Sequence, residues 1–371
     1  YLAYVTDAGE LFVLDRALQE HRRLPTAGRL LSNHGVHFDV TGDAGMMIYL
    51  AWDVQPVGGE LELSDGASGT ILAMDVNDTR QRQQVVGFCK GEDDRLCMGF
   101  SLSPDEQQIA MVDSRGVWTA PLAPVGEPQL VATVDGDATA RLRSWSPNGQ
   151  WLLMESRAIE APSLGLIPVT TATAGDSPGG VSDEEEAPSV AAVGTTAICA
   201  GPCRLGTGWD DSGLWITWDT AVQGCIGRID LAAPDTTAPG PANRSLAPPN
   251  PLCAVGAAAL HPRSPEVVEG YGLTFLHWGA DGAVGFPPGL YTESDLQPLV
   301  LLDQADAQGS VAWTASGEAF LLLDSNGAAA TIGVLTQSAF WDVRSLLQGA
   351  HAFRWGPPAS DPSASPEAIG R

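Results

Sequence analysis

Basic residues are scarce in this sequence. The 371 residues include 45 acidic side chains against 19 basic ones, and Lys90 is the only lysine. The resulting formal net charge of −26 repels phosphate backbones and anionic membrane surfaces. Binding to nucleic acid or to anionic membranes is therefore disfavoured, whereas neutral or basic protein surfaces, glycans and cations remain suitable partners.

Long apolar runs are also absent. No stretch approaches the ~20 residues that a membrane-spanning helix needs, and the longest runs, such as Ala254–Leu260, are interrupted by glycine. The 44% of hydrophobic residues still suffice for a core, while 42 glycines and 27 prolines favour short elements and many turns. Because the chain begins at Tyr1 and not at methionine, we expect that a signal peptide or lipidated leader has been removed.

Local catalytic motifs are missing as well. The sequence has no Gly-x-Ser-x-Gly elbow, no Gly-x-Gly-x-x-Gly or Walker sequence after a strand, and no Cys-x-x-Cys-His. We therefore expect no nucleotide, haem or other organic cofactor, and these absences favour a protein that is not an enzyme. Paired carboxylates of the glycosidase kind stay open, because 45 acidic residues give no basis for choosing a pair.

Candidate metal ligands are few. His34 and His37 form the one closely spaced histidine pair, but they lie in a Gly/Asn-rich segment without a third ligand. The clusters Asp135–Asp137, Asp210–Gly213 and Asp281–Gly282 could hold calcium through oxygen ligands, although none fits an EF-hand loop. Tight turns between strands explain these clusters equally well, so no metal site is assigned and calcium is the one ion considered.

Six cysteines are present, an even number with two closely spaced pairs. This pattern is typical of disulfides formed in an oxidising compartment. The expected pairs are Cys89 with Cys97, Cys199 with Cys203, and Cys225 with Cys253. Free thiols buried in the core are the alternative. The disulfide hypothesis predicts a periplasmic, outer-membrane-associated or secreted protein.

One phrase recurs along the chain and organises it. An aromatic or aliphatic residue is followed by a small polar residue, often Pro, then an Asp/Asn/Ser-Gly turn and a β-rich apolar run. Clear copies begin at Ser101, Ser144 and Ala312, with weaker copies at Phe38, Gly208 and Ala259. Proline ends a short strand, the turn residues tolerate positive φ, and the apolar run predicts a strand buried on both faces. With the strand that follows, each copy predicts one propeller blade of three or four antiparallel strands.

The repeat spacing and the two termini predict the number of blades. The marker positions are Val40, Leu102, Trp145, Asp210, Leu260 and Trp313, at intervals near the ~40–50 residues of a blade with insertions. A seventh copy at Ala352–Pro357 lacks its β-rich run, which Tyr1–Val5 and Leu11–Leu14 can supply. The sequence therefore predicts an all-β, seven-bladed β-propeller closed by pairing of N- and C-terminal strands in one blade.

Three polar segments interrupt or follow this array. We expect one propeller domain over residues 1–356, with insertions at about 170–196 and 234–251 that are rich in Ala, Gly, Ser or Pro. Residues 357–371 have the composition of a flexible C-terminal tail.

The phrases Ser103-Pro104-Asp105 and Ser146-Pro147-Asn148-Gly149, each followed by an apolar run, resemble the WD40-like or PD40 repeats of TolB-type bacterial propellers. This resemblance spans nearly the whole chain. It implies an extracytoplasmic bacterial propeller, but the motif marks a fold and no chemistry. The combined Gly-His/Trp-Asp signature of eukaryotic WD40 repeats is absent. We expect no room here for the additional N-terminal domain of TolB, so a Tol-type role is not implied.

Our leading functional hypothesis is a non-catalytic binding scaffold of the cell envelope or extracellular space that mediates protein–protein interaction, as a subunit of a surface assembly or alone. Trp145, Trp313 and Trp355 repeat at one blade position and indicate packing. Three further tryptophans fall outside that register and are candidates for a partner-binding surface: Trp52, Trp278 and Trp341. The alternative is a propeller enzyme acting on glycans, a hydrolase or lyase with carboxylates at the mouth of the central channel. Inward-facing acidic residues clustered with arginine would favour the enzyme.

Overall fold

Short β-strands joined by tight turns make up the described part of the chain, and no α-helix is found there. The computed structural model describes residues 1–14, 21–30, 38–41, 46–52, 55–57, 60–62, 69–76, 84–89, 99–113, 116–122, 126–133, 140–157, 162–169, 196–199, 203–211, 213–219, 223–231, 246–255, 266–268, 272–277, 289–292, 298–302, 309–314, 317–324, 326–335 and 339–356. The first predicted insertion, most of the second and the predicted tail lie outside these residues, as do His34, His37, Cys97, Trp278, Asp135–Asp137 and Asp281–Gly282.

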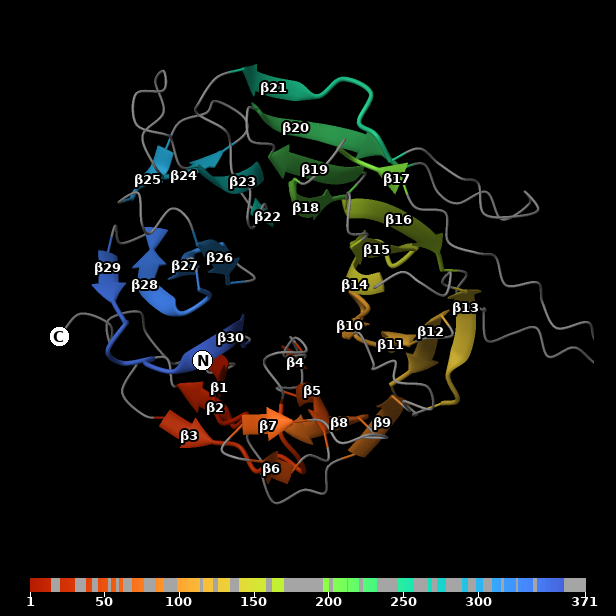
Figure 1. The fold of residues 1–371 in the computed structure, drawn as a ribbon, viewed down its shortest axis with the longest axis vertical. Helices are drawn as coiled ribbons and strands as arrows, with labels where there is room; N and C mark the ends of the chain where they lie inside the picture. The colour runs from red at the N-terminus through yellow and green to blue at the C-terminus, as the bar shows by residue number, and fades with distance from the viewer. Residues whose placement is uncertain are drawn as a thin grey trace, which may run out of the picture.

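Seven four-stranded antiparallel sheets stand around a common axis, which confirms the predicted seven-bladed β-propeller (Figure 1). Blade 1 consists of β4 (Phe38–Val40), β5 (Met46–Trp52), β8 (Gly69–Asp75) and β9 (Gln84–Cys89). Blade 2 consists of β10 (Phe100–Leu102), β11 (Gln108–Asp113), β12 (Gly116–Pro121) and β13 (Gln129–Thr133). Blade 3 consists of β14 (Ala140–Trp145), β15 (Trp151–Arg157), β16 (Pro162–Pro168) and β17 (Thr196–Ala197). Blade 4 consists of β18 (Arg204–Asp210), β19 (Gly213–Asp219), β20 (Gln223–Asp230) and β21 (Leu252–Val255).

The remaining blades complete the ring. Blade 5 consists of β22 (Glu266–Val268), β23 (Gly272–His277), β24 (Gly289–Thr292) and β25 (Pro298–Leu301). Blade 6 consists of β26 (Ser310–Trp313), β27 (Ala319–Leu323), β28 (Ala329–Val334) and β29 (Ala339–Asp342). Blade 7 combines β30 (Ala350–Trp355) with β1 (Leu2–Thr6), β2 (Leu11–Leu14) and β3 (His21–Arg23). A separate hairpin of β6 (Gln55–Val57) and β7 (Glu60–Glu62) lies between β5 and β8 in the chain.

Blade 7 joins the two ends of the chain. The C-terminal strand β30 is the innermost strand and pairs antiparallel with β1, placing Leu2 opposite Trp355 and Tyr4 opposite Phe353 (Figure 1). The predicted closure by terminal strands is therefore confirmed. It joins the two ends of the chain by hydrogen bonds within one sheet, so that the inner edge of β1 is not left free.

The recurring sequence phrase forms one kind of turn. In blades 2 and 3 the hydroxyl of Ser103 or Ser146 accepts the backbone N–H that begins the second strand, at 2.9 Å in both cases. Thr314 does the same in blade 6 at 3.2 Å. The fourth residue of each turn has a positive φ: 69° at Gly149 and Gly317, and 56° at Glu106. The repeat thus encodes how a first strand turns into a second.

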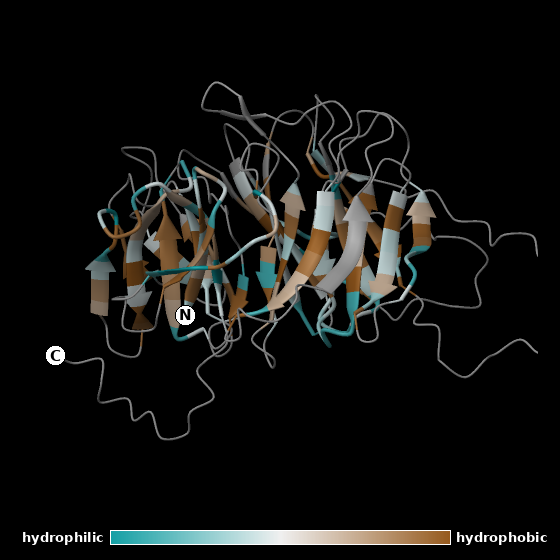
Figure 2. Cartoon of the chain, turned by 90° about the horizontal axis from the view of Figure 1, so that it is seen from below, coloured by the Kyte–Doolittle hydropathy of each residue, from teal (hydrophilic) through white to brown (hydrophobic). Residues whose placement is uncertain are grey.

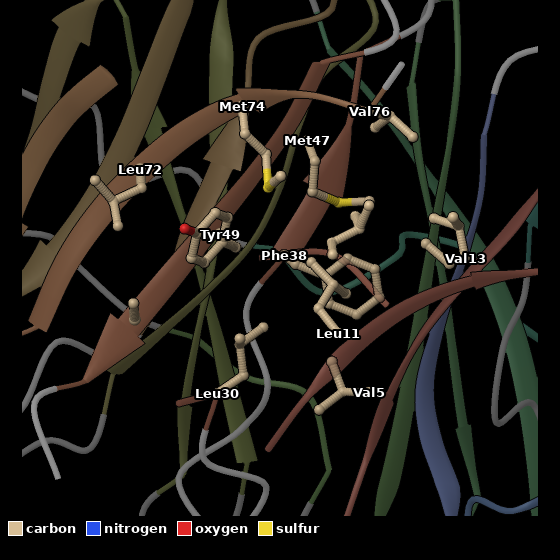
Figure 3. Packing of buried hydrophobic residues seen from close by; sticks show 13 residues of the cluster. Val5, Leu11, Val13, Leu30, Phe38, Met47, Tyr49, Leu72, Met74 and Val76 are labelled. Carbon is tan, nitrogen blue, oxygen red and sulfur yellow. The ribbon is translucent and has the colours of Figure 1, made fainter. Parts of the chain in front are cut away.

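Apolar side chains fill the spaces between neighbouring blades. Blades 7 and 1 share a cluster in which Leu11 lies beside Phe38 and Met47 (Figure 3). Comparable clusters join the other blades, and in side view hydrophobic residues run along much of the strands (Figure 2). Because each second strand is buried on both faces, its apolar run needs no alternation.

Indole side chains tie several blades together. The Nε1–H of Trp145 donates to the Ser101 carbonyl of the preceding blade at 3.0 Å, and that of Trp355 donates to the Ala312 carbonyl at 2.9 Å. Trp209 donates to the Ser144 hydroxyl at 2.7 Å. The predicted packing role of the repeated tryptophans is seen here, since their rings span the boundary between consecutive blades.

The structure corrects one expected blade position. The sequence phrase placed the start of blade 5 near Leu260, but its innermost strand is β22, beginning at Glu266. Leu260 lies outside the described residues. The copy was misplaced because β22 is only three residues long and carries no proline or Asn-Gly turn signal.

Two disulfides are present among the described residues. Cys225 and Cys253 face each other across β20 and β21, with a Cα–Cα distance of 4.1 Å, and Cys199 is joined to Cys203. Cys89 ends β9, and its predicted partner Cys97 lies outside the described residues. The Cys225–Cys253 bond fixes the outermost strand of blade 4 to its neighbour.

Candidate functional site

The innermost strands place one residue from each blade at the same height around the axis. In blades 1 to 6, this residue pairs with the third residue of the second strand. In blade 7, Arg354 pairs with Ala3, the third residue of the run that begins at Tyr1. We call these seven residues the axial ring: Asp39, Ser101, Ser144, Gly208, Glu266, Ala312 and Arg354. Three of them are charged, and the other four are small.

The side chains of the three charged residues bond to backbone groups that point toward the axis. Along a paired strand, consecutive residues direct their N–H and C=O groups to opposite edges. Thr41, Thr314 and Gly356 donate outward to the second strand, so the preceding residues point inward. The Asp39 carboxylate accepts the inward N–H of Val40, and the Glu266 carboxylate accepts the inward N–H of Trp313. Arg354 likewise donates to the inward carbonyl of Phe353 at 2.9 Å.

Glu266 is an acid of the ring whose pKa is strongly raised. Its carboxylate reaches from β22 to the backbone N–H of Trp313 on the next blade, and its side chain is half-buried. Burial among the surrounding strands raises the pKa of Glu266 to about 7, outweighing Arg354 and the Trp313 N–H, which both lower it. Glu266 is therefore partly protonated near neutral pH and can both donate and accept a proton.

Asp39 and Arg354 complete the charged part of the ring. Burial raises the pKa of Asp39, opposed by the positive charge of Arg354 and by the Val40 backbone N–H. Arg354 thus lies close enough to Asp39 and Glu266 to affect the pKa of both acids. The Arg354 side chain is exposed to solvent. Because the outer edge of β30 is paired with β1, solvent reaches this strand from the side of the axis.

A β-bulge positions Arg354. The register of β30 against β1 shifts at Ala352, which has a φ of 52° although it is not glycine. Bulges bend a strand and redirect the side chains beyond them, and a positive φ in a non-glycine residue is maintained only by its surroundings. Beyond the bulge, the Arg354 guanidinium lies 6.0 Å from the ring of Phe38, a buried residue of β4.

Other charged side chains near the innermost strands are bound in ion pairs. Glu155 is only 4% exposed and binds Arg143 at 2.6 and 2.7 Å. Asp210 binds Arg228 through both carboxylate oxygens and also accepts the Trp215 indole N–H at 3.0 Å. These partners hold the side chains in place, whereas Arg354 makes no ion pair within 4.0 Å among the described residues.

The predicted metal ligands that lie within the described residues do not come together as a metal site. Asp210 begins a two-residue hairpin that pairs it with Gly213, and its carboxylate is already occupied by Arg228. His34, His37 and the other two Asp/Gly clusters lie outside the described residues. Over the described ranges, no group of three or more His, Cys, Asp or Glu side chains is arranged to hold a metal ion.

The predicted partner-binding tryptophans have different environments. Trp52 is 3% exposed and packs in the core between blades 1 and 2, so it cannot serve as a surface anchor. It was singled out because it falls outside the tryptophan register, but it ends the apolar run of β5. Trp341 is 36% exposed on the outermost strand β29, beside the exposed Phe340. Trp278 is outside the described residues.

No protein-family model matches this sequence. No curated protein sequence matches it either. Among the described residues there is also no helix long and apolar enough to cross a bilayer.

Solved structures share the fold at low sequence identity. A putative 6-phosphogluconolactonase from Bacteroides fragilis is 10% identical, with a TM-score of 0.51, and the match covers 94% of each chain. Prolyl oligopeptidase B from Galerina marginata is 10% identical with a TM-score of 0.53, and the match covers 92% of this chain and 47% of the peptidase. A prolyl endopeptidase is 11% identical with a TM-score of 0.51, covering 94% and 47%. The chain thus spans about half the length of these peptidases.

These neighbours overturn the expectation that the protein is not an enzyme. That expectation combined the fold with the lack of local catalytic motifs, yet the same fold occurs in peptidases and in a putative lactonase. A propeller also brings together residues from separate blades, so its chemistry leaves no compact motif in the sequence. Asp39, Glu266 and Arg354 are such a set, and the sequence analysis did not find them. Asp39 and Arg354 each come just before the expected end of an innermost strand, whereas Glu266 lies on the strand that the sequence misplaced.

Proposed function

We propose that this chain is a hydrolase or lyase acting on a sugar-derived substrate, with the charged residues of the axial ring as its catalytic groups. The observation that carries the proposal is that Asp39, Glu266 and Arg354, from three different blades, lie at one height around the axis and influence one another. Inward-facing acids clustered with arginine are what the enzyme alternative requires. The putative sugar lactonase among the structural neighbours covers nearly the same length of chain and adds support.

The proposed chemistry uses two carboxyl groups with different tasks. In a hydrolysis, protonated Glu266 donates its proton to the leaving oxygen as the bond from carbon to that oxygen breaks. Asp39 accepts a proton from the water whose oxygen forms the new bond to carbon, so one water is consumed. Arg354 orients the substrate and stabilises negative charge on oxygen. A proton donor with a pKa near the working pH is well suited to this role.

The test is a kinetic comparison of the wild type with Glu266→Gln, Asp39→Asn and Glu318→Gln on a panel of aryl glycosides, uronides and sugar lactones. Removing an acid–base group typically lowers kcat/KM by about 10²–10⁴-fold. We expect losses of this size for the first two variants and none for Glu318→Gln, which removes an exposed acid of blade 6. Turnover that is the same in Glu266→Gln as in the wild type would disprove the assignment.

A second candidate function follows from the peptidase comparison. The match covers about half of each of these peptidases, so this chain would be the propeller part of a two-part peptidase. In that case the axial ring would contact peptide substrate and the chemistry would reside elsewhere. Glycoside or lactone turnover by the purified chain, sensitive to Glu266→Gln, favours the first candidate. Peptide cleavage that appears only when a catalytic partner is added favours the second.

We also propose that the chain is a TolB/PD40-type propeller and that it is exported from the cytoplasm. The Ser-Pro-Asp and Ser-Pro-Asn-Gly turns of blades 2 and 3 support membership among the TolB/PD40-type propellers. Two disulfides support a periplasmic, outer-membrane-associated or secreted location. A protein partner would find exposed apolar side chains at Phe340 and Trp341 on β29. Alanine substitution of both should then weaken co-purification of the partner without affecting turnover.

A further inference from the structure

We propose that the axial ring is selective for sugars that carry an anionic group, a carboxylate or a phosphate, and that Arg354 binds this group beside Glu266. The inference rests on the proposed function, because it names the substrate class of the same ring. An acidic protein would otherwise disfavour such ligands, so the selectivity has to come from local charge.

The innermost strands have a charge balance unlike the rest of the chain. They carry four arginines, at positions 141, 143, 204 and 354, against three acids, at positions 39, 210 and 266. The whole chain has 45 acidic residues and only 19 basic ones. A strongly negative protein repels anions over its surface, whereas the strands around the axis repel them far less.

Arg354 is the most available of the three arginines in this set whose side chains the structure describes, at positions 141, 143 and 354. Arg143 is held by the buried Glu155, and Arg141 stands opposite Glu155 in the register of β14 and β15. Arg354 is exposed, donates to the Phe353 carbonyl, and makes no ion pair within 4.0 Å in the described part of the chain. A guanidinium is always charged and offers a planar fork of donors that matches carboxylate and phosphate oxygens.

Glu266 sets the charge next to the bound anion, because its carboxyl is neutral when protonated. The strands packed around it add little competing charge. β26 has no ionisable residue, β18 has Arg204 and the paired Asp210 at its two ends, and β23 has only His277 at its end. Across the ring stand Arg354 and Asp39, with His351 further along β30 next to Asp7. Anion binding should therefore be accompanied by uptake of a proton on Glu266.

The pH dependence follows from this coupling. With the pKa of Glu266 raised to about 7 by burial, the carboxyl is mostly protonated at pH 5.5 and ionised at pH 8.5. Ionised Glu266 repels a bound anion. Affinity for an anionic sugar should thus fall as pH rises from 5.5 to 8.5, while that of a neutral sugar should change little.

The experiment is isothermal titration calorimetry of the full chain with D-glucuronate, D-glucose 6-phosphate, D-glucose and D-glucosamine. Glucuronate and glucose 6-phosphate distinguish a carboxylate from a phosphate as the preferred group, and the other two are neutral and cationic controls. We expect one anionic sugar to bind at least about tenfold more tightly than glucose at pH 5.5. Glucosamine binding as tightly as the anionic sugars would overturn the inference.

Matched variants locate the effect. Arg354→Gln should remove the preference for the anionic sugar, Arg354→Lys should keep part of it, and Arg344→Gln should leave it intact. Arg344 is an exposed arginine of blade 6 that pairs with Asp342. Glu266→Gln should retain anion binding and make it independent of pH. An equal loss in Arg344→Gln and Arg354→Gln would contradict a specific site, and thermal unfolding checks that each variant is folded.

The outcomes for binding and for catalysis can be told apart. If turnover depends on Glu266 but neutral and anionic sugars have equal KM values, the proposed function stands and the selectivity is wrong. If glucuronate binds through Arg354 but no substrate is turned over, the selectivity stands and the catalytic proposal is wrong.

Discussion

Glu106 has a left-handed backbone conformation, and glycine occupies the equivalent position in two other blades. Its φ is 56°, against 69° at both Gly149 and Gly317, and all three close the same turn through a 2.9 Å bond to the first turn residue. The left-handed conformation costs a side-chain-bearing residue roughly 1–2 kcal/mol, partly offset by the lower entropy of its unfolded chain. Blade 2 thus keeps the turn with a less favourable residue.

Glu106→Gly should raise the free energy of unfolding by about 0.5–1 kcal/mol, because relief of the strained φ outweighs the added entropy of the unfolded chain. Gly149→Ala should lower it by a similar amount. Urea unfolding followed by tryptophan fluorescence measures both. The interpretation fails if Glu106→Gly is destabilising while Gly149→Ala is neutral.

Glu266 should make stability depend on pH. Its folded-state pKa is raised to about 7, above the value of about 4.3 for an exposed glutamate, so the folded state holds a proton that the unfolded state releases between these values. The free energy of unfolding therefore falls as pH rises from about 4.3 to about 7, and the penalty persists at higher pH.

Glu266→Gln removes this penalty. At pH 8 it should raise the free energy of unfolding by on the order of 1–3 kcal/mol, and the two proteins should converge below pH 4, where Glu266 is protonated in both states. Urea unfolding at a series of pH values gives the difference, with Glu318→Gln as the control. A difference that is constant with pH would show that Glu266 does not titrate as described.

At the scale of elements, the innermost strands have two tasks. They present the axial ring and they bind neighbouring blades, and the same positions take part in both. Ser101 and Ser144 are equivalent ring residues, yet the indole of the next blade uses the backbone carbonyl of Ser101 and the side-chain hydroxyl of Ser144. The contact between blades is maintained although the accepting group differs.

This difference predicts unequal effects for one substitution at two matched sites. Ser144→Ala removes the acceptor of Trp209 and should lower the free energy of unfolding by about 1–2 kcal/mol, whereas Ser101→Ala leaves the carbonyl acceptor of Trp145 in place and should change it by under about 0.5 kcal/mol. Guanidinium unfolding of both variants provides the test. Equal losses would mean that the hydroxyl does not hold the two blades together.

At the scale of the whole molecule, closure depends on one strand. β30 covers the edge of β1, contacts both β26 and β4, and contributes Phe353 to the core shared by blades 6 and 7. It also carries Arg354, so the strand that closes the ring supplies the one cation of the axial ring.

A chain that ends at Gly349 lacks β30 and should lose its cooperative unfolding transition, because β1 becomes an unpaired edge and the core around Leu2 and Tyr4 is opened. A chain that ends at Gly356 keeps the strand and should unfold like the full chain. Circular dichroism during thermal unfolding distinguishes the two. An unchanged transition in the shorter chain would show that the ring does not depend on its terminal strand.

The sequence by itself determined the propeller. The turns and the buried apolar runs depend on interactions within a blade, which local residue types encode. The last repeat lacks an apolar run, which predicted its pairing with the N-terminal strands. These predictions were confirmed. Local patterns were less informative where a strand is very short, as in β22, and where an isolated residue such as Trp52 could equally be core or surface. The expectation of a non-catalytic protein was wrong because it treated a missing local motif as missing chemistry.

Only the tertiary structure decided which acids and which arginine come together. Asp39, Glu266 and Arg354 lie far apart in the chain, and they meet because the strand registers place them at one height in a closed ring. The pKa of Glu266 is likewise a property of that ring, since burial by strands from several blades raises it while Arg354 lowers it. No neighbouring residue in the sequence carries that information, because the electric environment of a side chain depends on what surrounds it in space.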